Sequence, residues 1–211
     1  MNIRQNRTLP TTFTPFKKGE HRTLVTLLKK GWRSKKVLTL TLDARASSFT
    51  WFICVFGVGT QEFPFSIHIK HKGTDTVSRV YVRSVLTDKA RIEFAGTSTI
   101  GPKAHRADTY LSFRSLLLSP EARAHTIPSL EILAKDVKAG HAASVDRFST
   151  SDLFYLQTRG LKEEAARTLL TRSFLAADLH HLDDTKAKKR ASDVISSWVT
   201  DTSYENNYAT R

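Results

Sequence analysis

The middle of the chain, from Val37 to about Val145, is a long run of segments in which apolar and polar residues alternate. This period of two is typical of β-strands, because successive side chains of a strand point to opposite faces. The clearest segments are VLTLTL, FPFSIHIKH, SRVYVRSVL and ARIEFAG. Beyond residue 96 the segments shorten to four or five residues, separated by small or polar residues. No helical periodicity interrupts the run, so we predict a mainly β fold.

Two folds can be built from so many strands. An antiparallel sandwich needs hairpins, whose tight turns favour Asn-Gly or Asp-Gly pairs, and the sequence contains neither pair. A parallel β-helix pairs each strand with the strand one coil away, and its corners accept Ala, Ser, Thr and single Gly residues. The residues therefore favour a parallel β-helix over 37–147. No clean repeat is visible, so the sandwich stays open as an alternative at this point.

The first 36 residues are strongly basic, with ten Lys or Arg and one acidic residue, Glu20, in a chain of net charge +13. We expect residues 1–36 to form an irregular arm with one short helix around Leu24, Leu27 and Leu28. Such an arm could bind the phosphates of nucleic acid, or could be a solvated segment that packs on an acidic partner. Its aromatic residues do not form a pattern that suggests base stacking, and it has no known nucleic-acid-binding motif. A basic β-protein that binds nucleic acid is therefore kept as the alternative function.

Helical periodicity replaces the alternation from residue 148 onward. Hydroxyl side chains at 149–151 can cap a helix over 152–159, and Gly160 suits the left-handed residue that ends it. A second helix is expected from Leu161, with Glu163 and Glu164 in its first turn. Its apolar stripe is expected to consist of Leu161, Ala165, Leu169, Leu170, Phe174 and Ala177.

The rest of the chain begins with a polar break at 180–190. A short third helix is expected over 191–201, followed by a mobile tail. We therefore predict a helical domain over 148–182, and a short helix with a mobile tail over 183–211.

Common catalytic and cofactor motifs are absent from the sequence. The glycines near Gly57 lack the Lys and Ser or Thr of a phosphate-binding loop, and the segment at Gly96 is not a nucleophile elbow. No Cys-x-x-Cys pair occurs that could hold zinc or an iron–sulfur cluster. The carboxylates of the strand region are scattered along the chain: Asp43, Glu62, Asp75, Asp88 and Glu93. We therefore predict that the protein is not an enzyme.

The single cysteine, Cys54, excludes an internal disulfide and fits a reducing compartment. Because it lies between Ile53 and Val55, we expect it to be a small core residue. The longest apolar run, residues 51–59, is too short to cross a bilayer, and the first ten residues lack the apolar region of a signal peptide. We expect a cytoplasmic protein that does not contact a membrane.

Five histidines bear on metal binding. His68 and His71 lie three positions apart in a strand, so they are expected on opposite faces and unable to share a metal. The adjacent His180 and His181 are expected in a solvated turn. His141 lies among Gly140, Ala142 and Ala143, which leave its ring room to approach a ligand or another chain. A structural histidine with satisfied hydrogen bonds is the alternative for His141.

The segment TIPSLEILAKDVKAGHAASVDRFSTSDLFYLQTRGLKEEAARTLLTRSFLAADL carries an ordered set of motifs. It contains a P-x-L-E-I block, a D-V pair, an H-x-A triplet, and an L-F-Y-L-x-T-R-G-L helix signature. This segment resembles the C-terminal part of the SufB/SufD family of iron–sulfur cluster assembly proteins. The upstream stretches HKGTDTVSRVYVRSVLTDKARIEFAGTSTIG and DTYLSFRSLLLS are similar to family coils. In all, the resemblance covers roughly residues 63–180.

The resemblance implies a right-handed parallel β-helix followed by a small helical domain. It implies a scaffold subunit of the SUF complex that dimerises through the β-helix with a SufB-like chain or with itself. It also implies that the helical domain docks a SufC-like ATPase, and that any iron or iron–sulfur cluster is bound transiently and only with the partner. His141 matches a family histidine near the dimer interface, and is therefore a candidate iron or cluster ligand.

The expected ATPase contacts lie on the helical pair. Three consecutive large residues at 153–155 point in different directions on a helix, so they cannot all be buried in one small domain. Gly160 is expected to set the angle between the two helices. The expected contact residues are Leu153, Phe154, Tyr155, Arg159, Gly160, Leu161, Glu164, Ala165 and Phe174.

The sequence departs from the SufB pattern at several positions. Phe113 occupies the place of a SufB cysteine, and Ala142 the place of a SufB glutamate. Lys162 replaces the usual capping residue of the second helix. The chain therefore looks SufD-like, shortened in its N-terminal region and unable to ligate a cluster alone.

Overall fold

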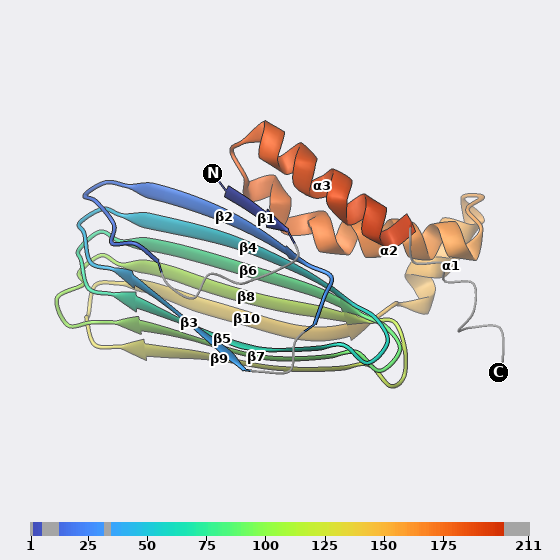
Figure 1. The fold of residues 1–211 in the computed structure, drawn as a ribbon, viewed down its shortest axis with the longest axis horizontal. Helices are drawn as coiled ribbons and strands as arrows, with labels where there is room; N and C mark the ends of the chain where they lie inside the picture. Colours follow the sequence, from blue (N-terminus) through green and yellow to red (C-terminus); the bar gives the residue numbers. More distant parts are fainter. Residues whose placement is uncertain (1, 6–12, 32–34, 201–211) are drawn as a thin grey trace.

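The protein is a two-sheet parallel β-helix with C-terminal helices packed over the outer face of one sheet, as a computed structural model describes it for residues 2–5, 13–31 and 35–200 (Figure 1). Every strand pair is parallel, with the order β1-β2-β4-β6-β8-β10 in one sheet and β3-β5-β7-β9 in the other. The predicted parallel β-helix is therefore confirmed. The strands are β1 (Asn2–Gln5), β2 (His21–Leu28), β3 (Lys36–Leu42), β4 (Ser48–Gly57), β5 (Glu62–His71), β6 (Val77–Leu86), β7 (Arg91–Ile100), β8 (Asp108–Leu117), β9 (Arg123–Ile132) and β10 (Lys138–Arg147).

The main core lies between the two sheets. Residues in equivalent positions of successive coils stack in columns, so that Trp51 pairs in register with Val80, and Val80 with Leu111. Their side chains are buried, as are the matching rings of Phe65 and Phe94 in the opposite sheet. Each added coil thus extends the same apolar columns, which gives the stack its stability.

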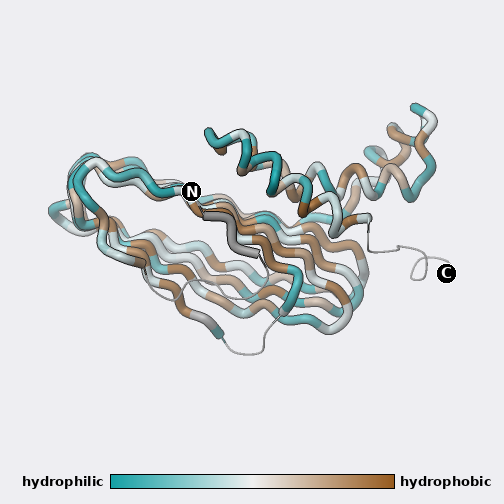
Figure 2. Tube along the Cα trace, turned by 45° about the horizontal axis from the view of Figure 1, so that its top comes forward, coloured by the Kyte–Doolittle hydropathy of each residue, from teal (hydrophilic) through white to brown (hydrophobic). Residues whose placement is uncertain are grey.

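The corner before the even-numbered strands is built without hairpins. Gly19, Ala46, Asp75 and Arg106 all have positive φ, between 55° and 69°. Each donates its backbone N–H to a carbonyl of the next coil, for example Asp75 to the carbonyl of His105 at 2.9 Å. Because the stacked turns satisfy one another, the absence of Asn-Gly and Asp-Gly pairs is explained. Figure 2 shows that these turns are largely hydrophilic, and that hydrophilic and hydrophobic residues alternate along the strands.

The continuous apolar run at 51–57 forms β4, which is buried on both faces. Trp51, Ile53 and Val55 point into the core between the sheets. Phe52, Cys54 and Phe56 point outward, where the C-terminal helices cover them. The placement of Cys54 as a buried core residue is therefore confirmed.

The short helix expected around Leu24, Leu27 and Leu28 is wrong. Residues 21–28 form β2, which pairs with β4 and belongs to the β-helix rather than to an irregular arm. Leu24 and Leu28 point into the core between the sheets, while Leu27 lies under the helices. Burial on both faces removes the alternation that marks a strand, and the spacing of the leucines imitates a helix. Residues 6–12 and 32–34 of the expected arm lie outside the described residues.

The four- or five-residue segments expected beyond residue 96 are also wrong, because β7 to β10 are ten residues long. The small and polar residues that looked like breaks lie inside the strands. Gly96 makes room for the ring of Phe113, since a Cβ at Gly96 would lie 2.4 Å from that ring. Ser84 and Ser115 are buried and share a hydrogen bond of 2.7 Å.

The C-terminal part contains α1 (Thr150–Thr158), α2 (Glu163–Ala176), a short 3-10 helix η1 (Ala177–His181) and α3 (Thr185–Thr200). Gly160 lies just beyond the end of α1 and has φ +91°, as predicted for the left-handed residue that ends this helix. The expected stripe of α2 is wrong by about one position, because Ala166, Thr171 and Leu175 are the buried residues and Ala165 is exposed. Packing against α3 and β6 selects this face.

The third helix is longer than expected, because α3 begins inside the predicted polar break. The carboxylate of Asp184 accepts the backbone N–H of Ala187 at 3.0 Å and caps its first turn. Ala191, Ile195 and Trp198 then pack on the outer face of the sheet that contains β2 and β4. The expected mobile tail lies outside the described residues from position 201. No described helix is both long and apolar enough to span a bilayer.

Candidate functional site

The last coil of the β-helix, β9 and β10, forms one candidate surface. No described strand pairs with the outer edge of either strand, so both present free backbone hydrogen-bonding groups. Large apolar side chains are exposed on this coil: Ile127 (49%), Ile132 (46%), Leu133 (58%) and Val145 (46%). Unpaired edges next to exposed apolar groups are typical of a surface that meets another chain.

His141 lies on β10 at the end of an interior column. It pairs in register with Leu111, which pairs with Val80, and both of these side chains are buried. His141 is exposed because no described coil covers it. Its ring makes no hydrogen bond with a described residue. The alternative, a structural histidine whose ring nitrogens are both hydrogen-bonded, would show such bonds. The ring is therefore exposed to solvent, with both nitrogens unbonded among the described residues.

A complete metal site is absent from the described part of the chain, where no three His, Cys, Asp or Glu side chains lie close enough to hold an ion. Phe113 fills the interior next to Ala143, with which it pairs in register. Its ring packs edge-on against Phe94, with ring centres 4.3 Å apart. Phe113, which stands where the SufB pattern has a cysteine, therefore contributes to core packing in this chain.

The first helix, α1, forms a second candidate surface. Leu153 is buried, whereas Phe154 is 68% and Tyr155 58% exposed, so the prediction that these three cannot all be buried is confirmed. The guanidinium of Arg159 lies 5.3 Å from the centre of the Tyr155 ring, a cation–π distance. Two neighbouring aromatic rings on α1 are thus largely exposed to solvent and form an apolar surface.

A groove of about 530 Å³ runs along α1 beside this surface. Its walls include Leu153, Phe154 and the ion pair between Glu163 and Arg167, whose closest atoms are 2.7 Å apart. The guanidinium of Arg167 also lies 5.6 Å from the ring of Phe148. The groove is thus apolar on one side and charged on the other.

The predicted contact residues do not all lie on one surface. Leu161 is half-buried, while Gly160, Glu164 and Ala165 are exposed at the junction of α1 and α2. Phe174 instead faces the β-helix. The guanidinium of Arg83 lies 5.0 Å from its ring and donates a 3.1 Å hydrogen bond to its carbonyl oxygen.

A buried ion pair fixes the helices on the β-helix. Arg83 of β6 is bonded to Asp178 of η1, with N–O distances of 2.5 and 3.1 Å. The thiol of Cys54 donates a hydrogen bond to the carbonyl oxygen of Leu175 at 3.5 Å. Burial raises the pKa of the Cys54 thiol to about 12. Such a thiol stays protonated at neutral pH and is a poor nucleophile or metal ligand.

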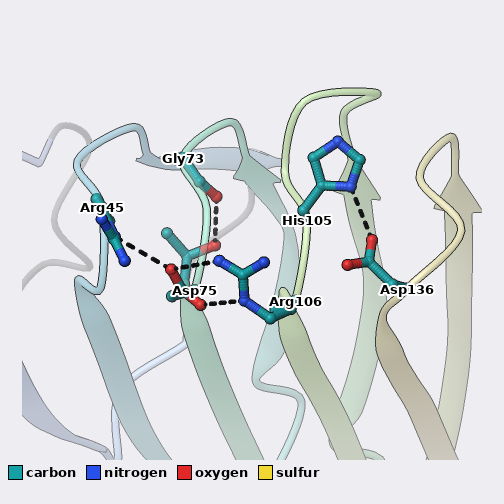
Figure 3. Close-up of polar contacts among 7 residues, drawn as sticks. Arg45, Gly73, Asp75, His105, Arg106 and Asp136 are labelled. Atoms are coloured by element: carbon teal, nitrogen blue, oxygen red, sulfur yellow. Dashed lines mark hydrogen bonds and ion pairs between the residues drawn. The ribbon is translucent and has the colours of Figure 1, made fainter.

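Sequence reasoning missed a row of charged residues along the corner of the coils (Figure 3). Asp75 is bonded to both Arg45 and Arg106, and Asp136 to His105. Arg45 and Asp75 lie 30 positions apart, and Asp75 and Arg106 lie 31 apart. Alternating charges at the length of one coil were the signal that could have revealed this row.

The histidine predictions can be compared with the structure. His68 and His71 lie on opposite faces of β5 as expected, with His71 buried and His68 half-buried. His181 is exposed, but its ring stacks on Tyr81 with centres 5.2 Å apart. His180 is exposed, and its ring contacts the carbonyl oxygen of Ala177.

Comparisons with known proteins agree with this architecture. Residues 9–174 match the family described as SUF system FeS cluster assembly, SufBD core domain. The iron–sulfur cluster assembly protein SufD of Bacillus subtilis is 36% identical over 141 residues, which is 67% of this chain and 32% of that protein. SufD of Escherichia coli is 32% identical over 113 residues, covering 54% of this chain and 27% of the relative. A SufBD family protein of Mycobacterium leprae is 36% identical over 112 residues, covering 53% and 29%.

The fold and its two surfaces define a parallel β-helical protein whose last coil has no described strand on its outer edge and whose first C-terminal helix is exposed. More specifically, this chain belongs to the SufBD family of the SUF iron–sulfur cluster assembly system, because the family match covers well over half of its residues. The chain spans about a third or less of the length of these relatives.

Proposed function

We propose that this chain is a SufD-like scaffold subunit of a cytoplasmic SUF complex, acting with a SufB-like chain and a SufC-like ATPase. In this proposal the chain is not itself an enzyme. The family match and the relatives named SufD support the assignment. The motifs for nucleotide binding that an ATPase needs are missing from its sequence, so ATP hydrolysis is assigned to the partner.

The observation that carries the proposal is the exposed aromatic surface of α1. Phe154 and Tyr155 together present two large rings to solvent. Tyrosine and other aromatic side chains often dominate the energy of protein interfaces, because they bury a large area at small entropic cost. The ATPase subunit is proposed to cover these rings, with Glu164 and Arg159 at the edge of the contact.

The last coil of the β-helix, formed by β9 and β10 and called the open coil below, is proposed to meet the second scaffold chain. At that contact His141 is proposed to offer an imidazole nitrogen to iron. Neutral imidazole is a good ligand for iron. The iron or cluster is cargo under assembly rather than a resident cofactor. One histidine cannot hold a cluster, so the remaining ligands are assigned to the partner chain.

Co-expression with SufB-like and SufC-like chains, followed by affinity purification, tests the proposal. Both partners are expected to copurify with the wild-type chain. Replacement of Phe154 and Tyr155 by Ser should remove the ATPase while the SufB-like chain is retained. Val37→Ser is the matched control, since it removes a similarly exposed apolar side chain from β3, which belongs to neither proposed surface. Copurification of neither partner with the wild-type chain would refute the proposal.

A further inference from the structure

A groove of about 620 Å³ lies at the corner where the turns before β6, β8 and β10 stack. It borders the last coil, because residues 135–138 form one of its walls. The opposite wall includes Asp75 and Arg106, both held in left-handed backbone conformations by the stacked turns. The walls of this corner groove are thus positioned by the β-helix itself.

Each carboxylate of the corner groove already accepts a hydrogen bond, two of them from arginines. Asp75 accepts hydrogen bonds of 2.6 and 3.0 Å from Arg106 (Figure 3). Asp108 accepts one of 2.6 Å from Arg79, and Asp136 is bonded to His105 at 2.8 Å (the latter pair in Figure 3). The hydrogen bond from Arg106 lowers the pKa of Asp75, and that from His105 lowers the pKa of Asp136.

Two lysines supply the remaining charge. Lys135 and Lys138 line the corner groove, are exposed, and make no ion pair with any described residue. The three acids of the lining face five cations, because Arg45, Arg79 and Arg106 bind two of the acids and the two lysines add to them, so the excess charge at the groove is positive. A carboxylate placed between these two lysines would gain favourable electrostatic energy without displacing an existing ion pair.

The surroundings favour a protein as the source of that carboxylate. Ile132 and Leu133 are exposed immediately before the groove-forming turn. The free edges of β9 and β10 adjoin it and can accept strands of another chain. An apolar patch next to a charged rim is the usual composition of a protein interface.

We propose that a second scaffold chain places an acidic side chain in the corner groove, between Lys135 and Lys138, when it covers the open coil. This inference rests on the proposed function, because that function supplies the second chain. The lysines would select a partner with an acidic rim and speed its association by electrostatic attraction. A partner lacking the carboxylate would leave two lysines without counter-ions.

The test uses the full chain and a purified SufB-like chain, with the dissociation constant measured by biolayer interferometry at fixed ionic strength. Lys135→Glu combined with Lys138→Glu is expected to weaken binding on the order of 100-fold. Lys72→Glu combined with Lys103→Glu is the matched control. These two lysines are exposed in turns of the same corner, outside the groove, and their reversal changes the net charge equally. The control should weaken binding less than about 5-fold.

The outcomes separate the inference from the proposed function. Equal effects of the two double variants, or no effect of either, would overturn the groove assignment while leaving the scaffold role intact. Failure of the wild-type chain to bind would refute the partner itself, and the inference with it. Sedimentation could show that the wild-type chain is a homodimer and that only the Lys135→Glu and Lys138→Glu double variant is monomeric. In that case the chain that binds the corner groove is a second copy of this chain, and the proposed partner is wrong. Thermal unfolding of each variant confirms that it folds.

Discussion

Acidification is expected to destabilise the protein through one buried histidine, His71. Its Nδ1 lies 2.8 Å from the hydroxyl of Thr76, and its Nε2 lies 2.8 Å from that of Ser78. The hydroxyl of Thr76 donates to the carbonyl oxygen of Gly73 at 3.1 Å, so it can only accept from the ring. The ring is therefore neutral with its proton on Nδ1, and Nε2 accepts from Ser78. Protonation of Nε2 would break this arrangement.

The size of the effect follows from the pKa. Burial lowers the pKa of His71 from 6.5 to about 4. The folded state therefore binds fewer protons than the unfolded state between these values, and its stability falls as pH falls. The stability is unaffected by this group well above pH 6.5. The loss of stability reaches about 2 kcal/mol at pH 5 and about 3 kcal/mol near pH 4.

Urea unfolding at pH 8 and pH 5 measures this effect in the wild-type chain and in His71→Asn, which keeps a donor near Nδ1. The variant is expected to be less stable at both pH values, because it loses a buried hydrogen bond, but its free energy of unfolding should change between pH 8 and pH 5 by about 2 kcal/mol less than that of the wild type. His125→Asn is the control, because that side chain is exposed and forms no hydrogen bond with a described residue. The same pH dependence in wild type and His71→Asn would refute the reasoning. Nitrogen chemical shifts of the ring provide a second measurement, since they should show the Nδ1-protonated neutral form at pH 6.

Three further predictions concern single positions. Gly96→Ala should lower the free energy of unfolding by about 1–3 kcal/mol, because its Cβ meets the Phe113 ring, and Phe113→Leu should restore part of the loss in chemical denaturation; an unchanged midpoint would contradict the close contact. Gly160→Val should weaken ATPase binding by forcing a β-branched residue to positive φ, whereas Gly160→Asn should be tolerated; calorimetric titrations that match wild type would show that the angle between the helices is not set there. His141→Ala should keep the melting temperature of the chain and lower the cluster absorbance of the anaerobically reconstituted complex, because the ring is exposed and unbonded; an undiminished cluster yield would reject the ligand role.

The sequence alone predicted the parallel β-helix and the end of the first helix. Alternation without hairpin turns favoured the β-helix over a sandwich, and the family resemblance implied it. The end of the helix followed from a local signal, a glycine where a left-handed residue is needed. It also placed Cys54 in the core from its two apolar neighbours. The family resemblance rested on a contiguous stretch of motifs, and the comparisons confirmed it.

Only the tertiary structure decided which side chains meet and which stay exposed. Residues 21–28 became a strand because they pair with β4, and because the opposite sheet and the helices bury their two faces, which no local pattern records. Phe174 faces Arg83, 91 positions earlier, and Asp75 meets Arg106, 31 positions later. His141 occupies an interior column, and is exposed because β10 ends the described stack. In a β-helix the partner of each side chain lies one coil away, so burial depends on where the stack begins and ends, which short-range periodicity does not encode.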